Sequence, residues 1–116
     1  MYQALHISPM IPSYNVRATV DFFKDVFEFT SLRDEDDMYV ILIKDNLTIH
    51  IQRAGDIGEM SFYMEVDDID ALWASAETKL IGINARAPFN RDYGMREFHV
   101  IVPHTKTLLF VGQGIR

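Results

Sequence analysis

Hydrophobic residues recur at intervals of three and four in two stretches of the chain, which is the spacing of an amphipathic helix. The first helix is expected over residues 15–27, where Asn15 can cap the free amides at the helix start. Its apolar positions are Val16, Val20, Phe23 and Phe27. The second helix follows Asp67 or Asp68 as the cap and ends before Gly82, which can adopt the left-handed conformation of a helix stop. Its buried stripe comprises Ile69, Leu72, Trp73, Ala76 and Leu80.

Elsewhere apolar residues alternate with polar ones, which indicates β-strands with one apolar face and one mixed face. The alternation is clearest in residues 47–52, 61–66 and 97–102. We expect the apolar faces to pack on the helices and the mixed faces to line a wetter, concave surface. Such a surface is where a ligand would bind.

The expected elements follow the same order twice along the chain. The first half has a strand near residues 3–11, the first helix, and strands near 28–33, 38–43 and 46–53. After a hinge at 54–58, the second half has a strand near 60–66, the second helix, and strands near 84–89, 95–102 and 106–111. Asn15 and Asp68 are 53 positions apart, as are Ser8 and Ser61. The sequence therefore predicts one α+β domain of two strand-helix-three-strand modules, about 1–55 and 58–116, forming a curved mixed sheet around a cleft.

The composition narrows the function classes. With 116 residues and 48% hydrophobic content, the chain can bury one core. It has no cysteine, which removes disulfides and thiolate chemistry and is compatible with a reducing cytoplasm. A net charge of −6 without a run of Lys or Arg argues against nucleic-acid binding and favours a neutral or cationic ligand. No stretch approaches the ~20 apolar residues that span a bilayer, so we expect a cytoplasmic protein without a membrane partner.

Three segments of the chain match a known family in order and spacing. They are residues 11–16 (Ile-Pro-Ser-Tyr-Asn-Val) with Phe22 and Phe23, residues 66–72 (Val-Asp-Asp-Ile-Asp-Ala-Leu), and residues 93–98 (Tyr-Gly-Met-Arg-Glu-Phe). Together they resemble the vicinal oxygen chelate superfamily, which includes glyoxalase I, extradiol dioxygenases, and fosfomycin- and bleomycin-resistance proteins. Segment 93–98 is most similar to the bleomycin-resistance type. The resemblance covers nearly the whole chain and implies the paired modules described above.

Metal-dependent members of this superfamily hold one divalent ion with His, Glu or Gln on the first and last strands of each module. Carried over by resemblance, these four slots fall on Ser8, His50, Ser61 and Leu109. His50 is the one competent ligand among them, because a serine hydroxyl binds divalent ions poorly and leucine does not bind them. We therefore expect no metal cofactor. If a divalent metal is bound after all, the fallback ligands are His6 and His50, with a third from Glu65, Glu97 or His99.

The candidate ligand-binding residues lie on the mixed faces of the predicted strands. Tyr63 and Tyr93 offer aromatic faces to a flat or cationic ligand, with packing at the rim as the alternative. Glu97 and His99 share a face, where a structural pair and a general base are both open interpretations. The predicted set is His50, Tyr63, Tyr93, Glu97 and His99, with no catalytic residue.

Three further features receive a structural interpretation. Arg96 neighbours Glu97 and therefore points to the opposite face, toward the helices or a second subunit. The charge run at 33–37 is interpreted as a solvated hairpin turn. Gly112 and Gly114 are expected to end the last strand.

The resemblance and these residues favour a small-molecule binding protein of the bleomycin-resistance type. Such a protein sequesters or carries its ligand in a groove between two subunits of a homodimer, without metal chemistry. One alternative is a metal-dependent glyoxalase-like lyase or dioxygenase that uses His50, His6 and an acidic residue. Another is a degenerate domain that mediates protein contacts and whose groove is filled.

Overall fold

A computed structural model describes residues 1–115 as two four-stranded sheets with two helices. The first sheet has the order β1-β4-β3-β2, from Met10–Ser13, Leu47–Arg53, Tyr39–Lys44 and Thr30–Asp34. The second has the order β5-β8-β7-β6, from Met60–Glu65, Thr107–Gly114, Met95–Ile101 and Phe89–Asn90. The helices are α1 (Val16–Phe27) and α2 (Ile69–Ala76), and the 3-10 turn η1 (Glu77–Leu80) continues α2. In each sheet the first pair of strands is parallel and the other pairs are antiparallel, which confirms the predicted α+β class and mixed sheets.

Both helices begin at the predicted caps. The Asn15 side chain accepts a 3.1 Å hydrogen bond from the amide of Ala18, and the Asp68 side chain accepts one of 3.1 Å from the amide of Ala71. Gly82 follows η1 with a φ of +84°, the left-handed conformation expected of a stop. Within residues 1–115, none of the helices is long and apolar enough to cross a membrane.

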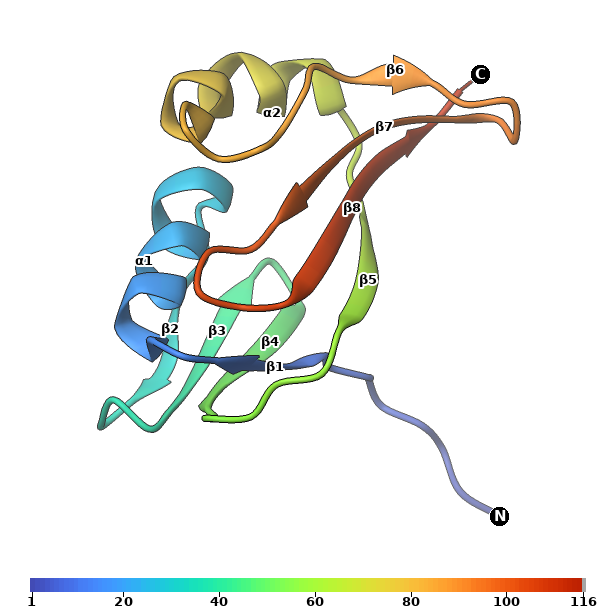
Figure 1. Cartoon of the computed structure of the whole chain (residues 1–116). Coiled ribbons are helices and arrows are strands. Elements are labelled where there is room, and N and C mark those ends of the chain that lie inside the picture. The colour runs from blue at the N-terminus through green and yellow to red at the C-terminus, as the bar shows by residue number, and fades with distance from the viewer. Residues whose placement is uncertain (116) are drawn as a thin grey trace.

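Two predicted strands are shorter than expected, and a proline stands at each boundary. The first strand was expected near residues 3–11 but spans Met10–Ser13, because Pro9 has no N–H to donate to the ladder. Residues 1–9 precede it: Ser8 and Pro9 still form hydrogen bonds with β4, and the residues before them lead away from the sheets (Figure 1). The strand expected near 84–89 is reduced to Phe89–Asn90 directly after Pro88.

The helices cover one face of each sheet and enclose a shared core. α1 packs on β3 and β4, α2 packs on β8, and the two helices contact each other (Figure 1). The aromatic part of this core comprises Phe22, Phe23, Phe27, Phe29 and Phe98. Trp73 is partly buried against the core with its ring centroid 5.1 Å from that of Phe98, consistent with the predicted stripe. No helix within residues 1–115 covers the opposite faces of the sheets.

Arg17 of α1 ties the helix to the turn between β2 and β3. Its guanidinium donates hydrogen bonds of 2.8 and 2.9 Å to Asp34 and further bonds of 3.0 and 3.3 Å to Asp37. The hydrogen bond from Arg17 lowers the pKa of Asp34 to about 2. The charge run at 33–37 was interpreted as a solvated turn, but two of its acidic residues, Asp34 and Asp37, form ion pairs with Arg17 of α1.

Replacing Arg17 with Gln is expected to lower the free energy of unfolding by about 1 kcal/mol at neutral pH, because the bidentate geometry is favourable although the pair is partly exposed. Since the folded-state pKa of Asp34 is depressed, this contribution is complete above the ordinary Asp pKa of about 4 and is lost as pH falls toward 2. Urea unfolding at neutral pH and near pH 2 measures the difference. Arg33→Gln removes a charge from the same turn and a more exposed pair with Glu35, so it is the control. Equal losses of unfolding free energy in the two variants would contradict a stabilising role for the hydrogen bonds from Arg17 to Asp34 and Asp37.

Candidate functional site

The face of the second sheet that points away from the helices, here the open face, carries three rows of side chains across β5, β8 and β7. The first row comprises Ser61, Leu108 and Ile101, the second Tyr63, Phe110 and His99, and the third Glu65, Gly112 and Glu97. Phe89 of β6 lies opposite Glu97 in the third row. The intervening residues Phe98, Leu109 and Val111 are fully buried on the helix side. The alternation predicted for residues 97–102 therefore holds, with Glu97 and His99 on the open face.

Glu97 is the centre of a hydrogen-bonded cluster on this face. Its side chain is 0% exposed although it lies on the face without a helix. Tyr63 donates a 2.8 Å hydrogen bond to Oε2, and Tyr93 donates one of 2.5 Å to Oε1. His99 Nε2 lies 2.9 Å from Oε1 and acts as the donor, because an ionised carboxylate can only accept. Three side chains from three segments are thus fixed by one carboxylate.

The cluster keeps Glu97 ionised and both tyrosines protonated. Burial alone raises the pKa of Glu97, but hydrogen bonds from His99, Tyr93 and Tyr63 outweigh it and hold the pKa below its ordinary value. The pKa of Tyr63 is raised by burial and by its hydrogen bond to Glu97. The pKa of Tyr93 is raised mainly by the same kind of hydrogen bond. At neutral pH the Glu97 carboxylate is therefore ionised and accepts from three donors.

Gly112 makes the Tyr63 contact possible. The Tyr63 side chain must cross β8 to reach Glu97, and it passes directly over Gly112. A Cβ atom at Gly112 would lie 1.8 Å from the Tyr63 hydroxyl oxygen and 2.6 Å from Cζ. Gly112 was expected to end the last strand, but β8 continues to Gly114. Its role is to leave space for a tyrosine from the neighbouring strand.

Aromatic rings cross all four strands beside the cluster. The ring centroids of Tyr63 and Phe110 are 6.2 Å apart and stacked, and those of Phe110 and His99 are 4.3 Å apart. His99 in turn lies 6.1 Å from Phe89 in an edge-to-face arrangement. These four residues, here the aromatic strip, give the open face a continuous aromatic surface on which a flat ligand could pack.

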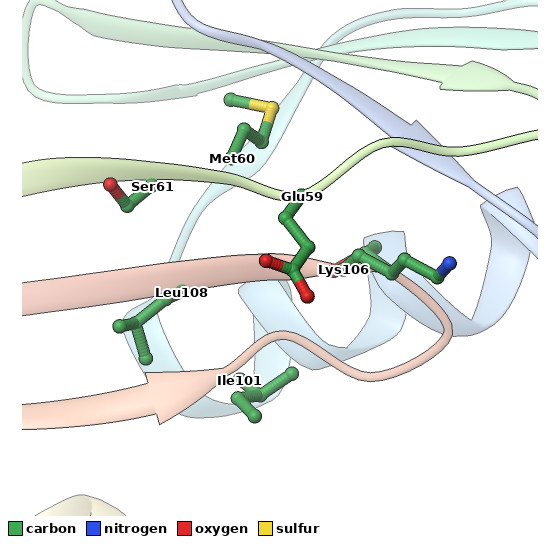
Figure 2. A pocket seen from close by; sticks show the side chains of 7 residues that line it. Glu59, Met60, Ser61, Ile101, Lys106 and Leu108 are labelled. Carbon is green, nitrogen blue, oxygen red and sulfur yellow. The ribbon is translucent and has the colours of Figure 1, made fainter.

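Two clefts adjoin the aromatic strip. The first has a volume of about 580 Å³ and lies over the first row of the open face, where Ser61, Leu108 and Ile101 occupy three neighbouring strands (Figure 2). Its remaining lining residues are Glu59, Met60, Thr105 and Lys106. The second has a volume of about 670 Å³ and lies between β4, β5 and the N-terminal segment, with Tyr63, Glu65 and His6 among its lining residues. Either is large enough for a small molecule.

His50 lies apart from the Glu97 cluster, on β4 of the first sheet. Its Nδ1 forms a hydrogen bond with the hydroxyl of Tyr39, and the two rings are 5.6 Å apart in an edge-to-face arrangement. The structure thus brings Tyr63, Tyr93 and His99 together around Glu97 and leaves His50 outside this group. Arg96 points to the helix side as expected, where it forms an ion pair of 3.0 Å with Asp70.

The residues present do not fit the divalent ion that the fold family implies. Strand register pairs His50 with Met10, while Ser8 lies before β1 and its hydroxyl contacts Thr48. The resemblance placed the fourth metal slot on Leu109, but Leu109 is buried in the core. The residues on either side of it, Leu108 and Phe110, lie on the open face. In the first sheet, His50 of β4 pairs with Met10 of β1. In the second sheet, the equivalent pair is Phe110 of β8 with Tyr63 of β5, so Phe110 corresponds to His50. Residues 1–115 contain no group of three or more His, Asp or Glu side chains placed to hold a metal.

Sequence reasoning missed Phe110, Phe89 and Gly112. Both alternating sets of β8 contain apolar side chains, Leu109 and Val111 in one and Leu108 and Phe110 in the other, so nothing local distinguishes Leu109 from Phe110 as the residue on the open face. The pairing of β8 with β7 places Phe110 opposite His99 and therefore on the open face. The signal available for Gly112 was a glycine inside a strand, which often marks a close approach by another group.

A search with the sequence finds no matching family model and no curated protein of related sequence. Solved structures with a similar fold include a bleomycin-binding protein from bleomycin-producing Streptomyces verticillus, complexed with copper(II)-bleomycin. It is 24% identical, with a TM-score of 0.77 over 98% of this chain and 99% of that chain. A bleomycin resistance determinant encoded on transposon Tn5 is 19% identical, with a TM-score of 0.79 over 96% and 98% of the two chains.

An enzyme also has this fold. Lactoylglutathione lyase from Agrobacterium tumefaciens is 15% identical, with a TM-score of 0.77 over 97% of this chain and 95% of that chain. At these identities the likeness establishes the fold, which is the one that the resemblance to the vicinal oxygen chelate superfamily implied. Binding proteins and a lyase share it, so the function must be argued from the site.

Proposed function

We propose that this chain, which has the vicinal oxygen chelate fold, binds a small molecule on the open face of the second sheet and sequesters or carries it without metal chemistry. The Glu97 cluster supports the proposal most strongly. A fully buried carboxylate orients Tyr63, Tyr93 and His99 on the open face, and Tyr63 lines the cleft of about 670 Å³. Because these side chains are already oriented, less conformational entropy is lost when a ligand binds.

The chemistry of the cluster favours a flat ligand that is neutral or cationic. Both tyrosine hydroxyls are committed to Glu97, so the rings of Tyr63 and Tyr93 rather than their hydroxyls are presented to a ligand. Tyr63 and Tyr93 are 43% and 54% exposed, so their surfaces are accessible. A phenol that donates to a carboxylate has an electron-rich ring, which attracts cations and electron-poor rings. Glu97 acts through these residues, because it has no exposed surface of its own.

Two-fold pairing of the chain would complete the groove. β1 and β5 are edge strands with one unpaired side, and the open faces have no helix over them. Met10 and Ile101 on these faces are 46% and 50% exposed. In a homodimer, the first sheet of one subunit could cover the open face of the other and bring His50 and Tyr39 to the ligand. Sedimentation equilibrium should give twice the 13.4 kDa chain mass, and a monomer at micromolar concentration would contradict the pairing.

A fluorescence titration with N-phenyl-1-naphthylamine, an uncharged aromatic probe, tests the groove. We expect saturable binding that weakens about tenfold in Tyr63→Ala, because the stacked ring at the β5 end of the strip is lost. Tyr14→Ala is the matched control, since Tyr14 is also 43% exposed but lies outside the open face. Absence of saturable binding, or equal effects of the two variants, would refute the proposed groove.

The lyase alternative needs His50, His6 and an acidic residue to converge, and residues 1–115 contain no group of three such side chains placed to hold a metal. His50 would need partners at Met10, Tyr63 and Phe110, or at the neighbouring positions Ser8, Thr48, Ser61 and Leu108. None of these is a strong ligand for a divalent ion. The alternative of a protein-contact domain expects a filled groove, whereas two clefts adjoin the aromatic strip. Small-molecule binding is therefore the function that these residues support best.

A further inference from the structure

Arg86 and Arg91 place two cations at the β6 end of the open face. The Cζ atom of Arg86 lies 4.2 Å from the centroid of the Phe89 ring. The Cζ atom of Arg91 lies 5.1 Å from the same centroid and 5.4 Å from that of Tyr93. Phe89 belongs to the aromatic strip, so both charges lie at the edge of the proposed groove. This concentration of positive charge stands out in a chain with a net charge of −6.

Neither guanidinium is neutralised within the part of the chain that the structure describes. The arginine ion pairs in residues 1–115 involve Arg17, Arg33 and Arg96. Glu97 lies opposite Phe89, but its oxygens are occupied by Tyr63, Tyr93 and His99. Two like charges held near one ring, with an ion pair to neither among residues 1–115, create a site that attracts an anion.

Stacking prepares these arginines for an oxyanion. A guanidinium that lies over an aromatic ring uses its flat face there, and its N–H groups remain free at the edge. That planar set of donors matches the oxygens of a carboxylate or phosphate and can bind them with two parallel hydrogen bonds. The aromatic contacts also restrict the motion of both side chains, which lowers the entropy lost when an anion binds.

We propose that Arg86 and Arg91 bind an oxyanion of the ligand whose flat part lies on Tyr63 and Phe110. The proposal rests on the proposed function, since it assigns one end of the same groove. It also refines the expected ligand. The flat body over the tyrosines is neutral or cationic, and a carboxylate or phosphate group extends from it toward β6.

Calorimetry with 2-naphthoate and 2-naphthamide tests the proposal, because the two probes differ in charge but have nearly the same shape. We expect wild-type protein to bind 2-naphthoate about tenfold more tightly than 2-naphthamide, and Arg86→Gln/Arg91→Gln to reduce this ratio to near one. Arg53→Gln is the control. Arg53 is exposed on β4 of the first sheet, and in residues 1–115 it has neither an ion pair nor a stacked ring. It should leave the ratio unchanged.

A second measurement separates this proposal from the proposed function. In NMR spectra of the arginine side chains, inorganic phosphate should shift the Nε–Hε signals of Arg86 and Arg91 saturably and leave that of Arg53 unchanged. If phosphate shifts the Arg86 and Arg91 signals but neither naphthalene probe binds, the anion site is supported and the proposed groove is refuted. If both probes bind with equal affinity and phosphate shifts neither signal, the groove stands and the anion site is refuted.

Discussion

Glu97→Gln is expected to weaken binding of N-phenyl-1-naphthylamine about tenfold and to lower the free energy of unfolding by about 2 kcal/mol. Glu97 accepts charge-assisted hydrogen bonds from Tyr63, Tyr93 and His99. A glutamine has the same shape but no charge, and its amide group presents N–H donors to side chains that are themselves donors. Because an amide nitrogen cannot accept, at least one of the three donated bonds is lost or must reverse its direction, and the rings that face the ligand are held less firmly.

The stability loss should depend on pH in a defined direction. The pKa of Glu97 lies below its ordinary value in the folded protein. Its contribution is therefore complete above the ordinary Glu pKa of about 4.3 and is lost as pH falls through the folded-state pKa. Urea unfolding of wild type and Glu97→Gln should show a difference at neutral pH that shrinks in acid.

Glu65→Gln is the matched control for Glu97→Gln. Glu65 occupies the same row of the open face, is exposed, and lies across Gly112 from Glu97. The two substitutions remove the same charge from the same face. Glu65 also lines the cleft of about 670 Å³, so Glu65→Gln is expected to weaken binding less than Glu97→Gln does. Equal effects would contradict the role assigned to the hydrogen-bonded cluster.

Gly112→Ala is expected to weaken probe binding about tenfold while lowering the free energy of unfolding by about 1 kcal/mol. The new methyl group would lie 1.8 Å from the Tyr63 hydroxyl oxygen, so the tyrosine must move. The displaced group is the end of a flexible side chain, which moves more easily than backbone. Tyr63 then loses its hydrogen bond to Glu97 and its stacking on Phe110. Function should suffer more than stability.

A double-mutant cycle makes this prediction specific. In a Tyr63→Ala background nothing remains for the methyl group to displace, so adding Gly112→Ala should have little further effect on binding. Gly114→Ala controls for adding a methyl group to β8, because a Cβ atom there has no neighbour within 4 Å. Additive losses from Tyr63→Ala and Gly112→Ala would contradict the proposed contact.

The local features of this fold could be read from the sequence. Asn15 and Asp68 cap their helices because a cap depends on residues within one turn. The alternation through Phe98 and His99 assigned Glu97 to the open face and Arg96 to the helices, since a strand fixes side-chain direction residue by residue. Predictions that depend on neighbours in sequence therefore succeeded.

Features that depend on which strands pair could not be read in this way. Tyr63 reaches Glu97 because β8 lies between β5 and β7 and has Gly112 at the crossing point. The same sheet order places His50 on a different sheet from Tyr63. A shift of one residue in the pairing of β7 with β8 would place Leu109 on the open face and bury Phe110.

The central claim is that the open face binds its ligand without a metal ion, and one comparison tests it most directly. Purified protein is analysed for metals and titrated with N-phenyl-1-naphthylamine before and after dialysis against EDTA, and again after addition of nickel, zinc or ferrous iron. We expect no stoichiometric metal and the same probe affinity throughout. One tightly bound metal per chain, together with loss of probe binding after its removal, would contradict the claim.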